Sequence, residues 1–256
     1  GMARGGYRPY FAVYSTFLQR AYDQIVHDVC LQNLPVCILS DHVGLVGDDG
    51  KTHHGVLSVP MLMSIPNLTL LAPRDTRQIR QAVRATLKLD GPCVVQYPKE
   101  GIEPYAQNVT GEPFAVGKWQ TLIPGGQDAV ILAYGRMTQN AIQASELLVQ
   151  RGLSVGVIDC CSLKPLDMDC LRALFERKAK IVTIEEGEMI GGFGSEIARV
   201  CVEENADAPV QIIGLENRFI THGSVPELLR ECGLTPEQLA DRIEEIAGDK
   251  ENSHVG

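Results

Sequence analysis

A run of glycines and titratable side chains near residue 50 is the part of the sequence best suited to chemistry. It reads Asp41-His42-Val43-Gly44-Leu45-Val46-Gly47-Asp48-Asp49-Gly50-Lys51-Thr52-His53-His54-Gly55. The run follows an apolar stretch over 35–39 that is typical of a buried parallel strand, and open α/β sheets bind ligands at the carboxyl ends of their strands. Glycine lets the backbone approach a ligand closely, and histidine transfers protons near neutral pH. By composition alone, a solvated Asp-Gly turn explains the run slightly better than a functional site does. The other motifs of the chain, described below, favour a functional site.

The composition predicts a folded, acidic protein. The chain has 256 residues, enough for one large domain or two of ordinary size, and 45% of them are hydrophobic. A net charge of −9 and a pI near 5.2 argue against a nucleic acid or an anionic membrane as partner. A phosphate group on a substrate therefore has to be held by a few local cations and backbone amides.

The cysteines and the apolar stretches indicate in which cellular compartment the protein is expected. Eight cysteines lie mostly within apolar stretches, and none forms a C-x-x-C pair, so they are typical of small buried side chains in a reducing compartment. No signal peptide is recognisable, and no apolar stretch approaches the roughly 20 residues of a membrane span. We therefore expect a soluble, cytoplasmic protein without a metal site on this chain.

Strand and helix patterns alternate along the first hundred residues, which is typical of an α/β fold. A helix is expected from Thr16, with Thr16 and Gln19 spaced as a capping box and Phe17 on its apolar stripe. The other elements expected in this unit are strands at 10–14, 36–40, 68–72 and 93–97 and helices at 57–64 and 75–88.

A second unit follows residues 101–127, which hold prolines, glycines and polar residues without periodicity and mark a domain boundary. Ser224 and Glu227 are spaced as another capping box. The expected elements are strands at 129–134, 154–158, 180–185 and 210–214 and helices at 138–151, 167–177, 194–204, 225–232 and 235–247. The predicted fold is two successive open, mostly parallel sheets flanked by helices, in domains at 1–105 and 115–248. Residues 1–6 resemble the end of a helix, so we expect the first domain to lack its opening strand and helix.

Several short motifs, spread over nearly the whole chain, resemble one enzyme family. They are Gly5-Gly6-Tyr7-Arg8-Pro9, the segment Tyr14 to Gln24, Gly44-Leu45-Val46-Gly47 through Thr52-His53, Ile65-Pro66-Asn67, Asp90-Gly91-Pro92, Tyr97-Pro98, Ile184-Glu185-Glu186, Gly191-Gly192-Phe193-Gly194-Ser195 and Arg218-Phe219-Ile220-Thr221-His222-Gly223-Ser224. Their combination is similar to the 1-deoxy-D-xylulose-5-phosphate synthases, which belong to the transketolase superfamily and depend on thiamine diphosphate. Members of that family have three domains, and this chain resembles the second, pyrimidine-binding domain followed by the C-terminal one.

The resemblance implies that residues 14–20 form the wall that holds the aminopyrimidine ring of the cofactor. Phe17 would stack on that ring, a contact that contributes about 0.5–1.5 kcal/mol beyond burial, although its spacing fits a core position on the helix equally well. Tyr14 would supply a hydrogen bond or simply pack. Arg20 lies near a helix N-terminus, where the dipole disfavours a cation, so it is either an ordinary surface residue or paired with a carboxylate or phosphate.

The resemblance also implies the chemistry of the glycine-rich run. Enzymes of this family add a thiazolium carbanion to pyruvate, release carbon dioxide and join the remaining fragment to glyceraldehyde 3-phosphate. The oxygens of both substrates exchange protons, a task that suits His53, while Asp49 would hydrogen-bond substrate hydroxyls. His54, the next residue, is expected to point elsewhere.

Three residues depart from the pattern of the family. The family usually has arginine, as a phosphate contact, where this chain has His42 and Lys99, and it usually has aspartate where this chain has Ser58. Arginine holds phosphate through two parallel hydrogen bonds, whereas lysine offers a point charge and histidine a partial one. His42, Lys99 and Ser58 are thus the expected substrate contacts, with a weaker or rearranged grip on phosphate, and a different acceptor aldehyde stays open.

The resemblance further implies that part of the cofactor machinery lies outside this chain. The pyrophosphate and Mg²⁺ motif of the family and its activating glutamate lie upstream of Gly1, and Gly47-Asp48-Asp49-Gly50 does not reproduce that motif. We expect the chain alone to be inactive and to need the rest of its polypeptide or a partner subunit, in a homodimer. The alternatives are the C-terminal subunit of a split transketolase, a 2-oxoacid dehydrogenase β-like subunit and a non-catalytic assembly module.

Overall fold

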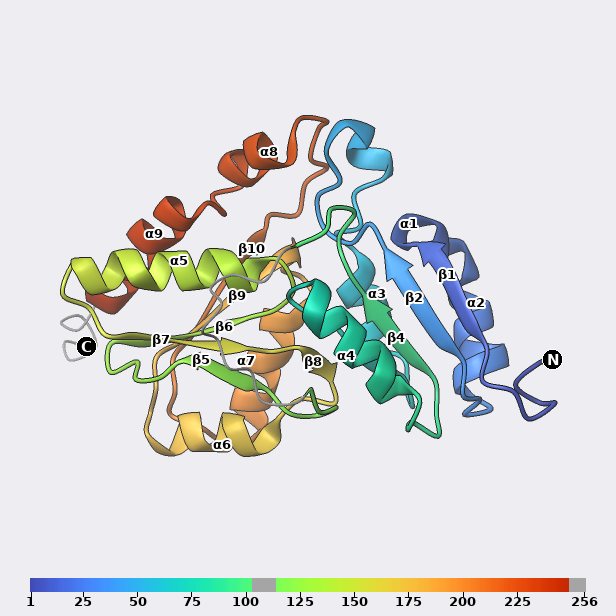
Figure 1. Cartoon of the computed structure of the whole chain (residues 1–256). Helices are drawn as coiled ribbons and strands as arrows, with labels where there is room; N and C mark the ends of the chain where they lie inside the picture. Colours follow the sequence, from blue (N-terminus) through green and yellow to red (C-terminus); the bar gives the residue numbers. More distant parts are fainter. Residues whose placement is uncertain (103–113, 249–256) are drawn as a thin grey trace.

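The computed structural model describes residues 1–102 and 114–248, which form two packed units with a five-stranded sheet in each (Figure 1). The first sheet has the strand order β1-β2-β4-β3-β8. Its four parallel strands, all predicted from apolar runs, are β1 (Tyr10–Tyr14), β2 (Cys37–Asp41), β3 (Thr69–Leu71) and β4 (Cys93–Gln96). The fifth, β8 (Ser162–Lys164), is antiparallel to β3 and was not predicted, because it forms by pairing with a strand more than 90 residues earlier in the chain. The second half of the chain therefore contributes a strand to the first sheet.

The helical segment after β1 changes its winding along its length. It consists of α1 (Ser15–Leu18), a 3-10 turn (Gln19–Ala21), α2 (Tyr22–Gln24) and a π-helical stretch (Ile25–Cys30). The capping box predicted at Thr16 and Gln19 is wrong, because the strand runs directly into the helix at Ser15 and no side chain caps the helix start. Thr16 lies inside the helix instead, where its buried hydroxyl has no hydrogen-bond partner among the described residues.

The apolar stripe predicted for this segment is correct only in part. Ile25 is buried, but Leu18 takes the buried position expected for Phe17, whose side chain is 45% exposed. Residues three or four apart share a face only where a helix keeps about 3.6 residues per turn, and this segment does not. The ring of Phe17 is therefore available for contacts outside the core.

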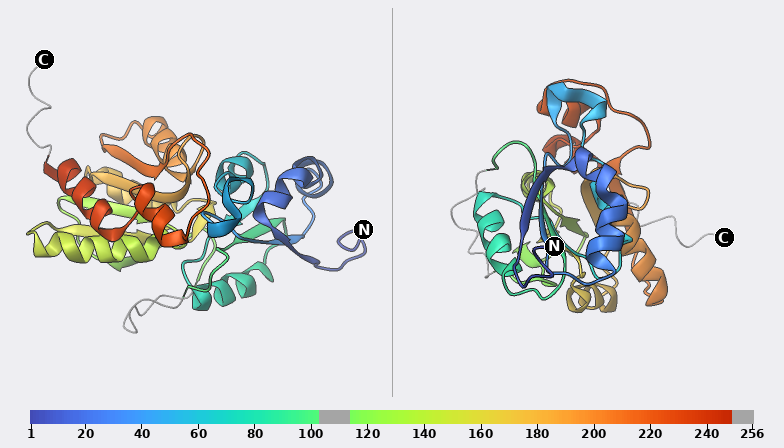
Figure 2. Two further views of the ribbon diagram at one scale, coloured as in Figure 1. Left: turned by 90° about the horizontal axis from the view of Figure 1, so that it is seen from above. Right: turned by 90° about the vertical axis from the view of Figure 1, so that its right-hand side faces the viewer.

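Two further helices flank the first sheet, α3 (Ser58–Met63) and α4 (Thr76–Thr86), close to their predicted positions. Helix α4 begins after Asp75, whose carboxylate accepts a hydrogen bond from the backbone N–H of Gln78 at 2.7 Å. Helix α4 covers one face of the sheet, and α1 to α3 lie on the other (Figure 2).

The second sheet has the strand order β10-β9-β6-β7-β5. Its parallel strands are β6 (Ala129–Ala133), β7 (Val155–Asp159), β9 (Ile181–Glu188) and β10 (Val210–Leu215). The antiparallel edge strand β5 (Gln120–Ile123) was not predicted, because the stretch 101–127, in which the domain boundary was placed, shows little periodicity. Residues 103–113 of that stretch lie outside the described part of the chain. The predicted fold class, two mostly parallel sheets flanked by helices, is confirmed.

Helices cover both faces of the second sheet (Figure 1). On one side lie α5 (Met137–Gln150) and α9 (Pro236–Gly248), and on the other α6 (Met168–Glu176) and α7 (Phe193–Glu203). The short helix α8 (Val225–Glu231) begins with the predicted capping box, in which the backbone N–H of Ser224 donates to the Glu227 carboxylate at 3.0 Å.

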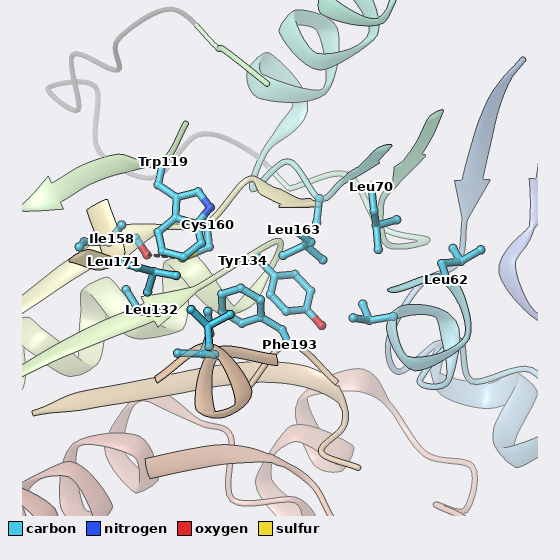
Figure 3. Close-up of a cluster of buried hydrophobic side chains, with 14 of the residues drawn as sticks. Leu62, Leu70, Trp119, Leu132, Tyr134, Ile158, Cys160, Leu163, Leu171 and Phe193 are labelled. Atoms are coloured by element: carbon cyan, nitrogen blue, oxygen red, sulfur yellow. Dashed lines mark hydrogen bonds between the residues drawn. The ribbon is translucent and has the colours of Figure 1, made fainter. Parts of the chain in front are cut away.

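One apolar core runs through both units (Figure 3). It contains Leu62 of α3 and Leu70 of β3 together with Phe193 of α7, all fully buried. The ring of Phe193 contacts Tyr134 and Trp119 edge-on, with centroids 5.6 and 6.0 Å apart. The two units therefore pack as one body, and segments of the second unit lie beside the first sheet.

A buried polar network also joins the units. Asp159, at the end of β7, accepts hydrogen bonds from the Arg74 guanidinium and, at 2.6 Å, from Gln78 Nε2. Arg74 also donates to Gln120 Oε1 at 2.8 Å. Burial raises the pKa of Asp159, and the charge of Arg74 opposes that rise.

Within residues 1–102 and 114–248, no helix is long and apolar enough to cross a membrane. The same part of the chain holds no group of three or more His, Cys, Asp or Glu side chains arranged for a metal ion.

Candidate active site

Four rings meet where β1 and β2 end. Tyr14 and Asp41 are opposite each other at the last register position of these strands, and the next residue, His42, stacks on Tyr14 with ring centroids 4.0 Å apart. The rings of Phe17 and His53 lie 4.9 and 5.6 Å from the Tyr14 ring. Residues that the sequence singled out are thus brought together at the carboxyl end of the sheet, where open α/β folds bind ligands.

The hydroxyl of Tyr14 is a donor for which the described residues offer no acceptor. It is buried and has no hydrogen-bond partner among the described residues. Burial, with smaller contributions from the Asp49 and Asp41 carboxylates, raises the pKa of Tyr14 to about 12. At neutral pH the hydroxyl therefore keeps its proton and can donate it to a ligand.

Phe17 presents its ring outward beside this hydroxyl. Its ring lies edge-on to His53 at 6.0 Å, and the Arg20 guanidinium carbon lies 5.8 Å from its centroid, within range of a cation–π contact. The alternative of a core position for Phe17 is wrong, because nearly half of the side chain is exposed. An exposed ring that is backed by other rings is a suitable surface on which to stack a flat heterocycle.

The charged residues of the glycine-rich run form pairs around the rings. Asp49 and Lys99 are joined at 3.2 Å, and this hydrogen bond lowers the pKa of Asp49, so its carboxylate is ionised at neutral pH. Nδ1 of His53 contacts the Thr52 hydroxyl at 2.8 Å. Nδ1 of His42 contacts the Asp41 carboxylate at 2.9 Å.

The run itself is a loop closed at its base. Gly44 and Gly55 exchange two backbone hydrogen bonds of 3.3 and 2.8 Å, and Ser15 donates its hydroxyl to the carbonyl of His42 at 2.8 Å. His42 has a φ of 57°, in the left-handed region. Between these closing bonds, residues 47–52 form short 3-10 turns on either side of a kink at Gly50, and Asp49 lies directly before the kink.

Two residues of the sequence analysis lie apart from the rings. Ser58 is buried at the start of α3, and its hydroxyl donates to Gln96 Oε1 at 2.9 Å. His54 is buried as well and points away from the ring cluster, as expected, with one ring nitrogen bonded to the backbone of Val46 and the other to that of Thr221. Of the substrate contacts expected from the sequence, His42 lies in the ring cluster, Lys99 is joined to it through Asp49, and Ser58 lies outside it.

Two charged residues of the second unit without a predicted role, Glu186 and Arg136, line a small cavity together with Val43 and Gly44 of the loop. Glu186, in β9, accepts a hydrogen bond from the backbone N–H of Leu45 at 2.8 Å and lies 3.4 Å from the Arg136 guanidinium. Burial raises the pKa of Glu186, opposed by Arg136. The signal in the sequence was the pair Glu185-Glu186 directly after the apolar run 181–184, because carboxylates rarely occupy a buried strand without a partner.

A groove of about 500 Å³ lies beside the ring cluster. Its lining includes Thr16, which precedes Phe17, and Thr52, which is bonded to His53. Its far wall comes from the second unit and includes Glu188 and Phe219. The volume is within the range of small-molecule pockets, about 300–1,000 Å³.

Comparison with protein families identifies the two units of the chain. The model of the transketolase pyrimidine binding domain matches residues 1–103, and that of the transketolase C-terminal domain matches residues 117–239. The chain belongs to the transketolase family. It carries two of the domains of that family, and the ring cluster lies in the pyrimidine-binding one.

Curated relatives that are about 40% identical to the chain include 1-deoxy-D-xylulose-5-phosphate synthases. The enzyme of Rippkaea orientalis is 40% identical over 248 residues, which are 96% of this chain and 39% of that protein. The enzyme of Geobacillus thermodenitrificans is 42% identical over 253 residues, 98% of this chain and 40% of that protein. The chain thus spans about two fifths of the length of the curated relatives it matches.

Solved structures of transketolases share the fold. One described as "Split gene transketolase, inactive beta4 tetramer" superposes with a TM-score of 0.84 at 28% identity, over 95% of this chain and 77% of that chain. Transketolase from Campylobacter jejuni superposes with a TM-score of 0.78 at 18% identity, over 95% of this chain and 36% of that chain, and supports the fold alone.

Proposed function

We propose that this chain is the C-terminal part of a thiamine-diphosphate-dependent enzyme with 1-deoxy-D-xylulose-5-phosphate synthase activity, which joins pyruvate to glyceraldehyde 3-phosphate with loss of carbon dioxide. The observation that carries the proposal is the exposed ring of Phe17 beside the Tyr14 hydroxyl, which has no partner in the described part of the chain, at the carboxyl end of the first sheet. The identity of about 40% with synthases of that name supports it.

The residues present fit the aminopyrimidine ring of thiamine diphosphate. Phe17 offers a face for stacking, Tyr14 offers a hydroxyl donor that lacks an acceptor, and Arg20 lies over the Phe17 ring. When bound, the cofactor supplies the carbanion that attacks the carbonyl carbon of the donor substrate. The contribution of these three residues is to bind and orient the ring.

His53 and Asp49 are proposed as the catalytic residues that face the substrates. With Nδ1 of His53 engaged by the Thr52 hydroxyl, Nε2 is the nitrogen that gives a proton to a substrate oxygen or takes one from it. Asp49, kept ionised by Lys99, accepts hydrogen bonds from substrate hydroxyls.

The acceptor substrate is held differently from the way in which the family usually holds it, with arginines at the positions of His42 and Lys99. Lys99 supplies a cation that is shared with Asp49, and His42 is engaged by Asp41 and by the Tyr14 ring. Ser58 acts only indirectly, because its buried hydroxyl is bonded to Gln96. A phosphate on the acceptor is therefore held less tightly than two arginine forks would hold it, and an acceptor without phosphate is the alternative.

We propose that the chain is inactive alone and works with a pyrophosphate-binding domain, which holds Mg²⁺, in a homodimer. Support comes from its span of about two fifths of the relatives and from the likeness to a split-gene transketolase. That likeness also favours the second candidate function, the C-terminal subunit of a split transketolase, whereas the greater identity to the synthases favours the first. A 2-oxoacid dehydrogenase β-like subunit and a non-catalytic assembly module are the remaining alternatives.

A cytoplasmic location is part of the proposal. Six of the eight cysteines are buried free thiols that serve as small core residues, which suits a reducing compartment.

Calorimetric titration of thiamine diphosphate with Mg²⁺ tests the proposal, using the chain alone and together with the separately produced N-terminal part of a relative. Binding and pyruvate decarboxylation only in the mixture are expected. Phe17→Leu should weaken the binding, and Phe11→Leu, at an exposed phenylalanine earlier in β1, is the matched control. A folded chain that binds no cofactor in either setting contradicts the proposal and favours an assembly module.

A further inference from the structure

The loop that carries Asp49 and His53 rests on the second unit. We call residues 42–55 the site loop. Its base is closed within the first unit by the bonds between Gly44 and Gly55. The part between them lies beside the segment that leads into α8, and the two views in Figures 1 and 2 agree on this.

The first contact between the site loop and the second unit is made by Glu186. Its carboxylate accepts the Leu45 N–H at 2.8 Å and is itself held 3.4 Å from Arg136. The carboxylate carbon lies 2.7 Å from where a side chain at Gly44 would begin, and φ of Gly44 is +81°, so only glycine fits there. Leu45 is fully buried, which means that its N–H depends on this acceptor.

The second contact runs through the buried ring of His54. Its Nδ1 accepts the backbone N–H of Val46 at 3.1 Å, and its Nε2 lies 2.9 Å from the carbonyl oxygen of Thr221. A carbonyl can only accept, so Nε2 carries the proton and donates it to Thr221. The ring thus ties the two ends of the loop to each other and to the second unit.

Two glycines let the backbone of the site loop approach the second unit between these bonds. A Cβ atom on Gly47 would lie 3.4 Å from the carbonyl oxygen of Gly223, and one on Gly50 would lie 3.1 Å from Cβ of His222. Both glycines have positive φ, 82° and 69°. Asp49 lies between them in the sequence, so its backbone is fixed on either side against residues 222–223.

We propose that the second unit positions the catalytic loop, with Glu186 and His54 as the positioning residues that hold Asp49 and His53 in place. The roles of Asp49 and His53 rest on the proposed function, whereas the contacts that fix their positions do not. A loop of this length without outside contacts fluctuates among many backbone conformations, and each hydrogen bond to the rigid second unit removes part of that freedom.

The test follows the His53 ring in the full chain by proton NMR, without cofactor or substrate. The ring lies 5.6 and 6.0 Å from the centroids of Tyr14 and Phe17, whose ring currents displace its signals from those of an unstructured peptide. His53→Gln assigns the signals among the six histidines of the chain. Circular dichroism and the thermal midpoint show whether each variant is folded.

The variants separate the two contacts. His54→Asn places an acceptor near the position of Nδ1 and keeps the bond to Val46, whereas His54→Gln places a donor near Nε2 and keeps the bond to Thr221. Glu186→Ala removes the acceptor of Leu45, and Glu186→Gln retains one. Arg151→Ala is the control, because its ion pairs with Asp241 and Glu244 lie on α9, away from the loop.

The expected result is that Glu186→Ala and His54→Asn shift the His53 signals toward those of an unstructured peptide, while Glu186→Gln, His54→Gln and Arg151→Ala leave them in place. In the complete enzyme the two shifting variants should lower kcat at least tenfold with little change in the Kd of the cofactor. Unmoved His53 signals in folded Glu186→Ala and His54→Asn overturn the proposal, and the second unit then only covers the loop. If His54→Asn does not fold, the Glu186 pair decides. Because the NMR readout needs no cofactor, it stands or fails independently of the proposed function.

Discussion

The ring of His42 lies parallel to that of Tyr14, with centroids 4.0 Å apart and 20° between the planes. The two residues stand at the ends of neighbouring parallel strands, and the bond from His42 to Asp41 holds the imidazole over the phenol. The Tyr14 hydroxyl is buried and has no acceptor within residues 1–102 and 114–248. A group of this kind destabilises the chain alone and is available to a ligand that brings an acceptor.

Replacement of Tyr14 by phenylalanine separates these two effects. An unpaired buried hydroxyl costs about 1–3 kcal/mol, so Tyr14→Phe should raise the free energy of unfolding of the chain alone by about 1 kcal/mol or more. The same variant should weaken cofactor binding in the complete enzyme roughly five- to tenfold, since one hydrogen bond is lost. Chemical denaturation and calorimetry measure the two quantities. A loss of stability together with unchanged binding would show that the hydroxyl has a partner within the protein.

Phe17 and Leu18, adjacent in sequence, should respond in opposite ways to truncation. Leu18 is 1% exposed, and Leu18→Ala should lower the free energy of unfolding by about 2–5 kcal/mol through the cavity that it leaves. Phe17 faces outward, so Phe17→Ala should cost about 1 kcal/mol or less in the chain alone and should weaken cofactor binding in the complete enzyme. Urea denaturation of the two variants decides which residue belongs to the core. A larger stability loss for Phe17→Ala contradicts the assignment of its ring to the site.

The parallel strands could be predicted from the sequence, and so could the place where the candidate site residues come together, because both depend on local patterns. Apolar runs such as 36–40 mark buried strands, and the polar, glycine-rich residues that follow mark the carboxyl end of the sheet. The motifs of the family added Tyr14, Phe17 and His53, which the structure brings together. The roles of these residues stay predictions.

The rest depended on contacts between residues far apart in the chain. The bond between Leu45 and Glu186 joins positions 141 residues apart, and no local pattern reports such a pair. The three-residue strand β8 joins the first sheet for the same reason. The buried face of the helix after β1 was misjudged because the winding changes at Gln19 and again at Ile25, which a constant period of 3.6 does not describe.

Glu185 should make the stability of the chain depend on pH near neutrality. Its carboxylate is fully buried in β9 and accepts hydrogen bonds from the Phe193 and Gly194 N–H groups, and burial raises its pKa to about 7. The unfolded chain releases this proton near pH 4.5, so between about pH 4.5 and 7 the folded state binds more protons and its stability falls as pH rises. The loss is at most about 3 kcal/mol.

The variant Glu185→Gln isolates this contribution, since glutamine stays neutral over the whole range. Urea denaturation of both proteins at several pH values should give a difference in unfolding free energy that changes between about pH 4.5 and 7 and is flat below. A constant difference from pH 4.5 to 8 means that the pKa of Glu185 is not raised.

The buried link between Arg74 and Asp159 should be among the most sensitive points of the fold. Arg74→Met leaves a buried carboxylate without its cation, which typically costs about 3–5 kcal/mol. Arg151→Ala, which breaks two ion pairs at the surface, should cost far less, because water screens exposed charges. Guanidinium denaturation compares them. Similar costs for the two variants would mean that Asp159 is neutral in the folded chain.

Lys99 should determine how well the complete enzyme distinguishes a phosphorylated acceptor from its unphosphorylated counterpart. Lys99→Arg replaces a point charge with a planar fork that can hold phosphate through two hydrogen bonds, so the KM for glyceraldehyde 3-phosphate should fall about five- to tenfold, while that for glyceraldehyde stays unchanged. Lys99→Ala should raise the KM for glyceraldehyde 3-phosphate. It should also raise the pKa of Asp49, because the carboxyl group loses its hydrogen bond to Lys99. Because both side chains are more than 40% exposed, the unfolding free energy should hardly change. Steady-state kinetics with both acceptors at two salt concentrations measures the effect, and equal changes for the two acceptors contradict a role of Lys99 in phosphate binding.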